Sequence, residues 1–116
     1  MIKMVQMKEL MSLDEVDAFI MNNELAFLYI TQPNCSVCHG LKPQLIPILE
    51  QYNQLATASI DSSQIPAIAG QLNIFTVPVA LLFVNGKEYF RKARFIPLAE
   101  LNDELERVYT NMVDEH

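Results

Sequence analysis

Two cysteines, Cys35 and Cys38, are the residues of this sequence best suited to chemistry, and only Ser36 and Val37 separate them. A pair this close cannot link distant parts of the chain, so it is not the disulfide framework of a small secreted domain. In a reducing compartment such a pair is more often catalytic, redox-sensing or metal-binding than structural. The elements around the pair must decide between these chemistries.

The sequence predicts a strand before the cysteines and a helix after them. Residues 25–30 are continuously apolar and rich in β-formers, which is typical of a strand buried on both faces. Residues 36–52 have helical apolar spacing, although Pro43 and Pro47 each remove a backbone hydrogen bond and favour a bend. Cys35 therefore opens a helix, where unpaired N–H groups and the helix dipole favour a thiolate over a thiol.

The rest of the chain predicts further alternating elements. A short strand is predicted over residues 3–8, and Ser12 with Glu15 forms a capping box before a helix that Asn22-Asn23 ends. The later predicted elements are a strand over 56–61, a helix over 65–71 that ends near Gly70, a strand over 79–84, a hairpin turn at Asn85-Gly86, an antiparallel strand over 87–95 and an amphipathic helix after Pro97. The order is β-α-β-α-β-α-β-β-α.

Composition and charge narrow the class of protein. The 116 residues suit a single domain over 1–116, and 51% hydrophobic with 19% charged residues is a globular composition. The formal charge of −6 without a basic cluster argues against a nucleic-acid partner. No apolar run approaches the roughly 20 residues of a spanning helix, so we expect no membrane partner. The N-terminus lacks a signal-peptide pattern, so we expect a cytoplasmic protein.

These landmarks, in this order, resemble the thioredoxin family along nearly the whole chain. A β-α-β unit precedes Cys35-Ser-Val-Cys38, and a proline follows at Pro43. Ser59-Ile-Asp61 closes the third strand, and Thr76-Val-Pro78 precedes the fourth. The resemblance implies an α/β fold, a three-layer sandwich in which helices flank a central mixed sheet. It also implies that the Val77–Pro78 peptide bond is cis and lies beside the cysteines, because the family has a cis proline there.

The resemblance implies a thiol–disulfide oxidoreductase that contributes to cell redox homeostasis. Cys35 would be the nucleophile and Cys38 the resolving residue, and Val77, Pro78 and Asn34 would contact the substrate. The implied partners are protein disulfides, and a reductase or a low-molecular-weight thiol that supplies electrons. No cofactor and no metal is implied.

The site also departs from thioredoxins proper. Their Trp-Cys-Gly-Pro-Cys is replaced here by Asn34-Cys-Ser-Val-Cys38, and the chain contains no tryptophan. Their buried aspartate, thought to assist deprotonation of the resolving thiol, corresponds to Tyr29, and the lysine that pairs with it corresponds to Thr57. These differences bear on the rate of exchange and on recognition by the usual reductase. The sequence therefore resembles that of a thioredoxin-like protein with a divergent active site.

Three other interpretations of the cysteine pair remain open. Cys38 followed by His39 completes Cys-x-x-Cys-His, the attachment motif of c-type haem, which would require export. A zinc ion needs four ligands, and the chain offers the cysteines with His39 and His116, whereas an iron–sulfur cluster shared by two chains needs fewer from each. A thioredoxin fold can also act as an interaction module with little turnover.

Overall fold

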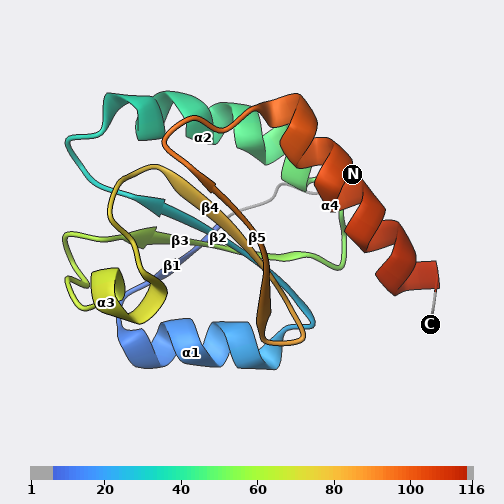
Figure 1. Ribbon diagram of the computed structural model, residues 1–116, viewed down its shortest axis with the longest axis horizontal. Coiled ribbons are helices and arrows are strands. Elements are labelled where there is room, and N and C mark those ends of the chain that lie inside the picture. Colours follow the sequence, from blue (N-terminus) through green and yellow to red (C-terminus); the bar gives the residue numbers. More distant parts are fainter. Residues whose placement is uncertain (1–6, 115–116) are drawn as a thin grey trace.

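The computed structural model describes residues 7–114, which form a five-stranded sheet between two layers of helices (Figure 1). In chain order the elements are β1 Lys8–Leu10, α1 Leu13–Asn22, β2 Leu25–Thr31, α2 Ser36–Leu49, β3 Ala56–Asp61, α3 Ile68–Leu72, β4 Val79–Val84, β5 Lys87–Ala93 and α4 Leu98–Asp114. The strand order is β1-β3-β2-β4-β5, in which β1, β3 and β2 are parallel and β4 and β5 run antiparallel to their neighbours. The predicted three-layer α/β sandwich with a mixed sheet is confirmed.

Strand β2 lies at the centre of the sheet and is buried on both faces, as its continuous apolar sequence predicts. Phe27 and Tyr29 pack in the core beneath α2 and α4, whereas Leu28 and Ile30 pack in the core beneath α1 and α3. Figure 1 shows these two helix pairs on opposite faces of the sheet. Because β2 is fixed from both sides, the loop that leaves its end at Thr31 starts from a rigid point.

At two places, a local sequence feature produces the element boundary that the sequence predicts. The hydroxyl of Ser12 accepts a hydrogen bond of 3.1 Å from the backbone N–H of Glu15, which caps α1. Asn85 and Gly86 both have positive φ angles, 52° and 83°, and join β4 to β5 in a two-residue hairpin. Positive φ at both central positions is the requirement of a type I′ turn.

The first strand lies further along the chain than predicted. It covers Lys8–Leu10, whereas residues 3–8 were expected, and residues 3–6 lie outside the described part of the chain. Leu10 is 1% exposed and pairs with Ile60 of β3. Burial of Leu10 against the parallel neighbour therefore sets the position of the strand.

Four other predicted boundaries were wrong by one to three residues. Helix α2 ends at Leu49, not at residue 52, because the next turn closes with shorter three-residue bonds such as Tyr52 N–H to Leu49 O. Helix α3 begins at Ile68 rather than residue 65, because the preceding turn also closes with three-residue bonds. It ends at Leu72, two residues after Gly70, because the next residue, Asn73, takes a left-handed conformation. Strand β5 ends at Ala93, not residue 95, because Arg94 has a φ of 66°.

Helix α4 closes the layer that also contains α2. Its buried residues Leu101, Leu105 and Val108 face the sheet, as the amphipathic spacing predicts. Lys92 of β5 ties this helix to the sheet edge, because its Nζ lies 3.0 Å from a carboxylate oxygen of Glu100 and 3.1 Å from one of Glu104. None of the helices within residues 7–114 is long and apolar enough to cross a membrane.

Candidate active site

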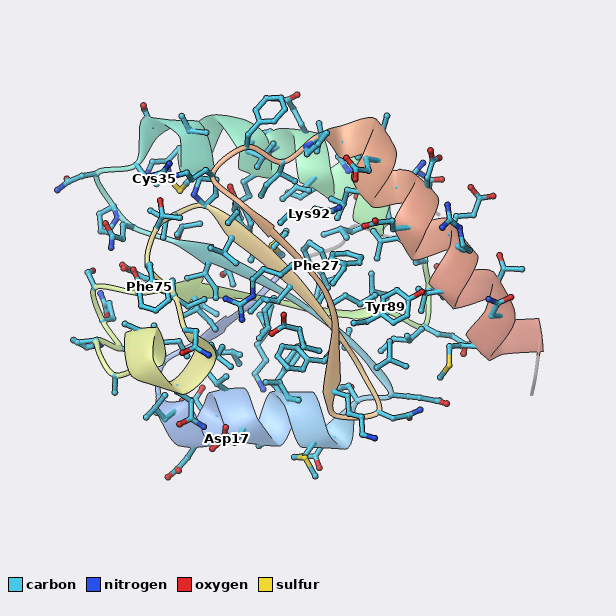
Figure 2. The ribbon with its side chains drawn as sticks, in the orientation of Figure 1. Asp17, Phe27, Cys35, Phe75, Tyr89 and Lys92 are labelled. Atoms are coloured by element: carbon cyan, nitrogen blue, oxygen red, sulfur yellow. A yellow bond between two sulfur atoms is a disulfide. The ribbon has the colours of Figure 1, made fainter. Side chains whose placement is uncertain are left out.

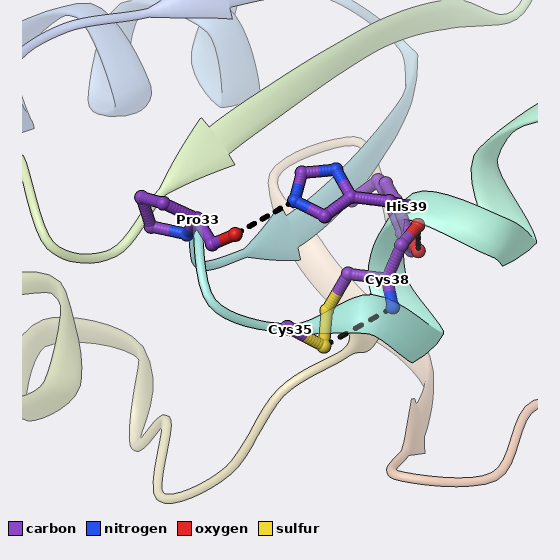
Figure 3. Close-up of a disulfide and its surroundings, with 5 residues drawn as sticks. Pro33, Cys35, Cys38 and His39 are labelled. Carbon is purple, nitrogen blue, oxygen red and sulfur yellow. Dashed lines mark hydrogen bonds between the residues drawn. A yellow bond between two sulfur atoms is a disulfide. The ribbon is translucent and has the colours of Figure 1, made fainter.

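Cys35 and Cys38 form a disulfide bond at the start of α2, with their Cα atoms 5.2 Å apart (Figure 3). Cys35 is the N-cap residue of this helix, and its Sγ accepts a hydrogen bond of 3.1 Å from the backbone N–H of Cys38. Such a donor, together with the positive end of the helix dipole, favours negative charge on the sulfur when the disulfide is reduced. The backbone geometry therefore suits Cys35 to carry a thiolate.

The two sulfurs differ in their access to solvent. Cys38 is 1% exposed, whereas Cys35 is only partly buried. A disulfide of another protein can therefore approach Cys35 more easily than Cys38. This asymmetry agrees with the order of attack that the resemblance implies, although the roles themselves remain a prediction.

Tyr29 lies beneath the cysteines, at the position where thioredoxins have a buried aspartate. The side chain is fully buried on β2, and its hydroxyl donates a hydrogen bond of 2.7 Å to the carbonyl oxygen of Cys38. Burial raises the pKa of Tyr29 to about 12. The phenol is therefore neutral near pH 7, and it holds the first turn of α2 without acting as a base. Sequence analysis noted the substitution but missed this bond, since no local pattern predicts which carbonyl a core tyrosine reaches.

His39 connects the helix to the loop before the cysteines. Its Nε2 lies 2.9 Å from the carbonyl oxygen of Pro33, which can only accept a hydrogen bond, so Nε2 carries the proton (Figure 3). The backbone N–H of His39 also donates to the carbonyl oxygen of Cys35, at 3.3 Å. The position of a histidine directly after Cys38 was visible in the sequence, but its contact with Pro33 was not predicted.

A polar pocket of about 250 Å³ opens beside the disulfide. We use the name polar pocket for the space lined by Glu9, Tyr29, Thr31, Gln32, Pro33, Cys38, His39, Lys42, Ser59 and Asp61. These residues come from the three parallel strands, from the loop that follows β2 and from the first turns of α2. The pocket therefore connects the buried side of the Cys38 turn to charged surface groups.

The predicted substrate-contact residues lie on two loops. The Val77–Pro78 peptide bond is cis, and Pro78 is buried while Val77 is partly exposed. Val77 and Gln32 line one pocket of about 210 Å³, so the proline loop lies against the loop that leads to Cys35. Asn34 is exposed directly before Cys35. No contact of any of these residues with a substrate is tested, so their roles remain predictions.

An exposed apolar residue stands next to this loop. Phe75 is 88% exposed, and Figure 2 shows it at the same end of the molecule as Cys35. Val37, between the two cysteines, is also an exposed hydrophobic residue. Sequence analysis did not predict the exposure of either residue, because a single apolar residue in a short loop, as Phe75 is, or in the first turn of a helix, as Val37 is, does not reveal its exposure.

The hypothesis of a metal site at the cysteines is not supported by any cluster of candidate ligands in the described part of the chain. Within residues 7–114, no group of three or more His, Cys, Asp or Glu side chains is arranged to hold a metal ion. His116, one of the candidate ligands from the sequence, lies outside the described residues.

The fold and the cysteine pair together define a protein of the thiol–disulfide oxidoreductase class. The Thioredoxin family model matches residues 8–107, and the chain therefore belongs to the thioredoxin family. It is 40% identical to the thioredoxin-like protein YdfQ of Bacillus subtilis over 106 residues, which cover 91% of this chain and 95% of that protein. It is 25% identical to the chloroplastic M-type thioredoxin of Spinacia oleracea over 77% of this chain and 50% of that protein.

Solved structures agree on the fold. A mutant thioredoxin from Halobacterium salinarum has a TM-score of 0.79 at 24% identity, covering 90% of this chain and 91% of that one. A thioredoxin from Plasmodium falciparum has a TM-score of 0.77 at 20% identity, and the match covers 84% of this chain and 97% of that one. At such identities the likeness shows the fold alone.

Proposed function

We propose that this protein exchanges the Cys35–Cys38 dithiol and disulfide with disulfides of other proteins, and so contributes to redox homeostasis in the cytoplasm. The observation that carries the proposal is the disulfide at the start of α2, which joins a partly exposed cysteine to a buried one. A structural cross-link would gain little from this position, because the loop it closes is too short to constrain the unfolded chain strongly.

The proposed reaction has two exchanges. In the reduced protein the Cys35 thiolate attacks one sulfur of a substrate disulfide, forms a mixed disulfide and releases the first substrate thiolate. The Cys38 sulfur then attacks Cys35, loses its proton and expels the second substrate sulfur as a thiolate. The substrate gains two electrons and becomes a dithiol, and the protein is left with the Cys35–Cys38 disulfide.

The substrate segment would lie across the loops that present Val77 and Phe75. An extended peptide can pair with exposed backbone at Val77, next to Pro78. Phe75 and Val37 offer apolar surface for side chains on either side of the substrate cysteine. Asn34 stands in place of the tryptophan of thioredoxins and would give a smaller, more polar contact.

A partner must reduce the disulfide again for turnover. We propose a reductase or a low-molecular-weight thiol in this role. Because Tyr29 and Asn34 replace residues that thioredoxins use, the thiol is the donor to test first.

Reduction of insulin tests the proposal. With dithiothreitol as electron donor, the protein should accelerate precipitation of the insulin B chain, and a Cys35→Ser/Cys38→Ser variant should not. A Met21→Gln variant, changed on the exposed surface of α1, should match the unchanged protein. If the wild-type protein gave no more precipitation than dithiothreitol alone, the proposal would be wrong, and the interaction-module hypothesis would gain.

A further inference from the structure

Arg94 has a backbone conformation that is unusual for a residue with a side chain. Its φ angle is 66°, in the left-handed region where glycine is the residue normally found. The backbone N–H of Phe95 donates a hydrogen bond of 2.8 Å to the carbonyl oxygen of Ala93, so Arg94 is the central residue of a three-residue turn. A positive φ angle at the centre of such a turn is rare and strained. Glycine would adopt this conformation without strain, so the backbone does not favour an arginine here.

This turn is fixed against the cis-proline. The backbone N–H of Arg94 donates a hydrogen bond of 2.8 Å to the carbonyl oxygen of Pro78, and the preceding residue, Ala93, pairs with Val79 in the sheet. Figures 2 and 3 show the segment before β4 passing beside the disulfide. Val77, the proposed pairing site of the substrate backbone, directly precedes Pro78. Arg94 therefore lies at the edge of the proposed substrate site.

The Arg94 side chain is exposed and has no ionic partner. Within the described part of the chain, no salt bridge or hydrogen bond involves its guanidinium group. The two nearest cations along β5 are both paired. Arg91 lies 2.8 Å from a carboxylate oxygen of Glu88, and Lys92 lies 3.0 Å from one of Glu100. The guanidinium of Arg94 thus keeps its five N–H donors available for a carboxylate from outside the chain.

Exposed apolar side chains accompany this charge. Phe95 follows Arg94 directly and is 80% exposed. Phe75 on the proline loop and Val37 between the cysteines are exposed as well. The surface around the proposed substrate site therefore combines apolar side chains with an unpaired positive charge. Its complement is a protein segment in which acidic residues lie close to the cysteine of the disulfide.

We propose that Arg94 selects protein disulfides flanked by acidic residues, because its guanidinium binds a substrate carboxylate beside the cis-proline loop. The inference rests on the proposed function and adds a substrate class to it. Arg94 takes no part in the sulfur exchange, which stays with the two cysteines. The strained conformation of this residue then serves binding rather than stability, as backbone strain at a functional site often does.

Two model substrates separate charge recognition from chemical reactivity. Both are symmetrical disulfides of a short peptide with one cysteine, and they differ only in having Glu or Gln on either side of that cysteine. Acid quenching and mass spectrometry give the rate constant for oxidation of the reduced protein by each peptide at low ionic strength. Comparing the Glu-to-Gln ratio of rate constants between protein variants cancels the intrinsic reactivity of each peptide.

An Arg94→Gln variant removes the charge and keeps a polar side chain. Its Glu-to-Gln ratio should be about two- to fivefold lower than that of wild type, which is the size expected for one exposed ion pair. Its rate constant with the Gln peptide should be unchanged. Arg94→Lys should retain most of the wild-type ratio, because the positive charge remains. Added salt should lower the wild-type ratio toward that of Arg94→Gln.

An Arg107→Gln variant is the matched control, because Arg107 is an exposed arginine of α4 and the substitution changes the net charge by the same amount. Its ratio should equal that of wild type. An equal fall of the ratio in Arg107→Gln and Arg94→Gln would reflect net charge alone and would overturn the inference. Equal slowing of Arg94→Gln with both peptides would also overturn it.

An Arg94→Gly variant separates binding from stability. Its midpoint of urea unfolding should equal or exceed that of wild type, since glycine relieves the strain, while its Glu-to-Gln ratio should fall as in Arg94→Gln. A large loss of stability would assign Arg94 a structural role and contradict the inference. A ratio that is the same in every variant would overturn the inference and leave the proposed function intact. If reduced wild-type protein reacted with neither peptide, the proposed function itself would be wrong.

Discussion

Tyr29 and Cys38 are joined by a hydrogen bond of 2.7 Å from the phenol hydroxyl to the backbone carbonyl oxygen. The bond connects the central strand β2 to the first turn of α2, beneath the disulfide. Thioredoxins place a carboxylate at the position of Tyr29, so this chain replaces an ionisable group by a neutral donor. The replacement changes how the first turn of α2 is held.

A Tyr29→Phe variant should be less stable by about 1 kcal/mol, because it removes one hydrogen bond and keeps the buried ring. The Cys38 carbonyl oxygen retains the acceptor role of an ordinary helical carbonyl, so a larger loss is not expected. Urea unfolding at pH 7, with the disulfide intact in both proteins, measures the difference. A stability equal to that of wild type would contradict the importance of the bond.

The same residue predicts a pH dependence of stability. The pKa of Tyr29 is about 12 in the folded protein, whereas the ordinary value of an exposed tyrosine is about 10. Above pH 10 the unfolded chain loses this proton first, so the stability that Tyr29 contributes is complete below pH 10 and falls as the pH rises toward 12.

Comparison of Tyr29→Phe with wild-type protein isolates this effect. Denaturant unfolding between pH 9 and 12 should show a steeper loss of stability in wild type than in the variant, which lacks the group. Equal slopes would mean that the Tyr29 hydroxyl titrates as it does in the unfolded chain.

Phe75 should contribute to binding of protein substrates. A Phe75→Ser variant should raise the KM for insulin about three- to tenfold, since removing an exposed aromatic contact costs on the order of 1 kcal/mol of binding. Its reaction with a small aromatic disulfide should change little, because such a substrate reaches only the sulfurs.

A Tyr89→Ser variant is the control for this prediction, because Tyr89 is also an exposed aromatic residue but belongs to β5. It should leave the KM for insulin unchanged. A similar increase in both variants would argue against a specific contact at Phe75.

The sequence predicted the fold where the pattern of burial is strong. Strand β2 was predicted from an apolar run that packs into both cores, and α4 from apolar spacing that does face the sheet. The predicted boundaries of α2, α3 and β5 were wrong because short turns and a positive φ angle at Arg94 determine where these elements begin or end. Apolar periodicity indicates neither a short turn nor a positive φ angle.

The candidate site was predicted in part for a similar reason. The spacing of Cys35 and Cys38 is local and is read directly from the chain, as is the position of Pro78. The contacts of Tyr29 with Cys38 and of His39 with Pro33 depend on how the end of β2 meets the first turns of α2. No local residue pattern predicts how these two elements pack together, so both contacts are seen only in the structure.

The reduction potential should reflect the residues between the cysteines. Ser36 and Val37 replace the Gly-Pro of thioredoxins, and we expect this change to alter how the helix start stabilises the Cys35 thiolate. The disulfide should therefore be more oxidising than the roughly −270 mV of thioredoxin, by a few tens of millivolts, where about 30 mV is tenfold in the equilibrium constant. Equilibration with glutathione measures this value, and a potential at or below that of thioredoxin would show that the prediction is wrong.

Trapping of mixed disulfides tests the central claim most directly, because it identifies the cysteine that attacks the substrate. Reduced Cys38→Ser and Cys35→Ser variants are mixed with insulin, and non-reducing electrophoresis with mass spectrometry measures the covalent complex. The Cys38→Ser variant should accumulate a complex through Cys35, since no resolving thiol remains, and the Cys35→Ser variant should accumulate little, since Cys38 is buried. Equal trapping by both variants, or trapping by neither, would contradict the account.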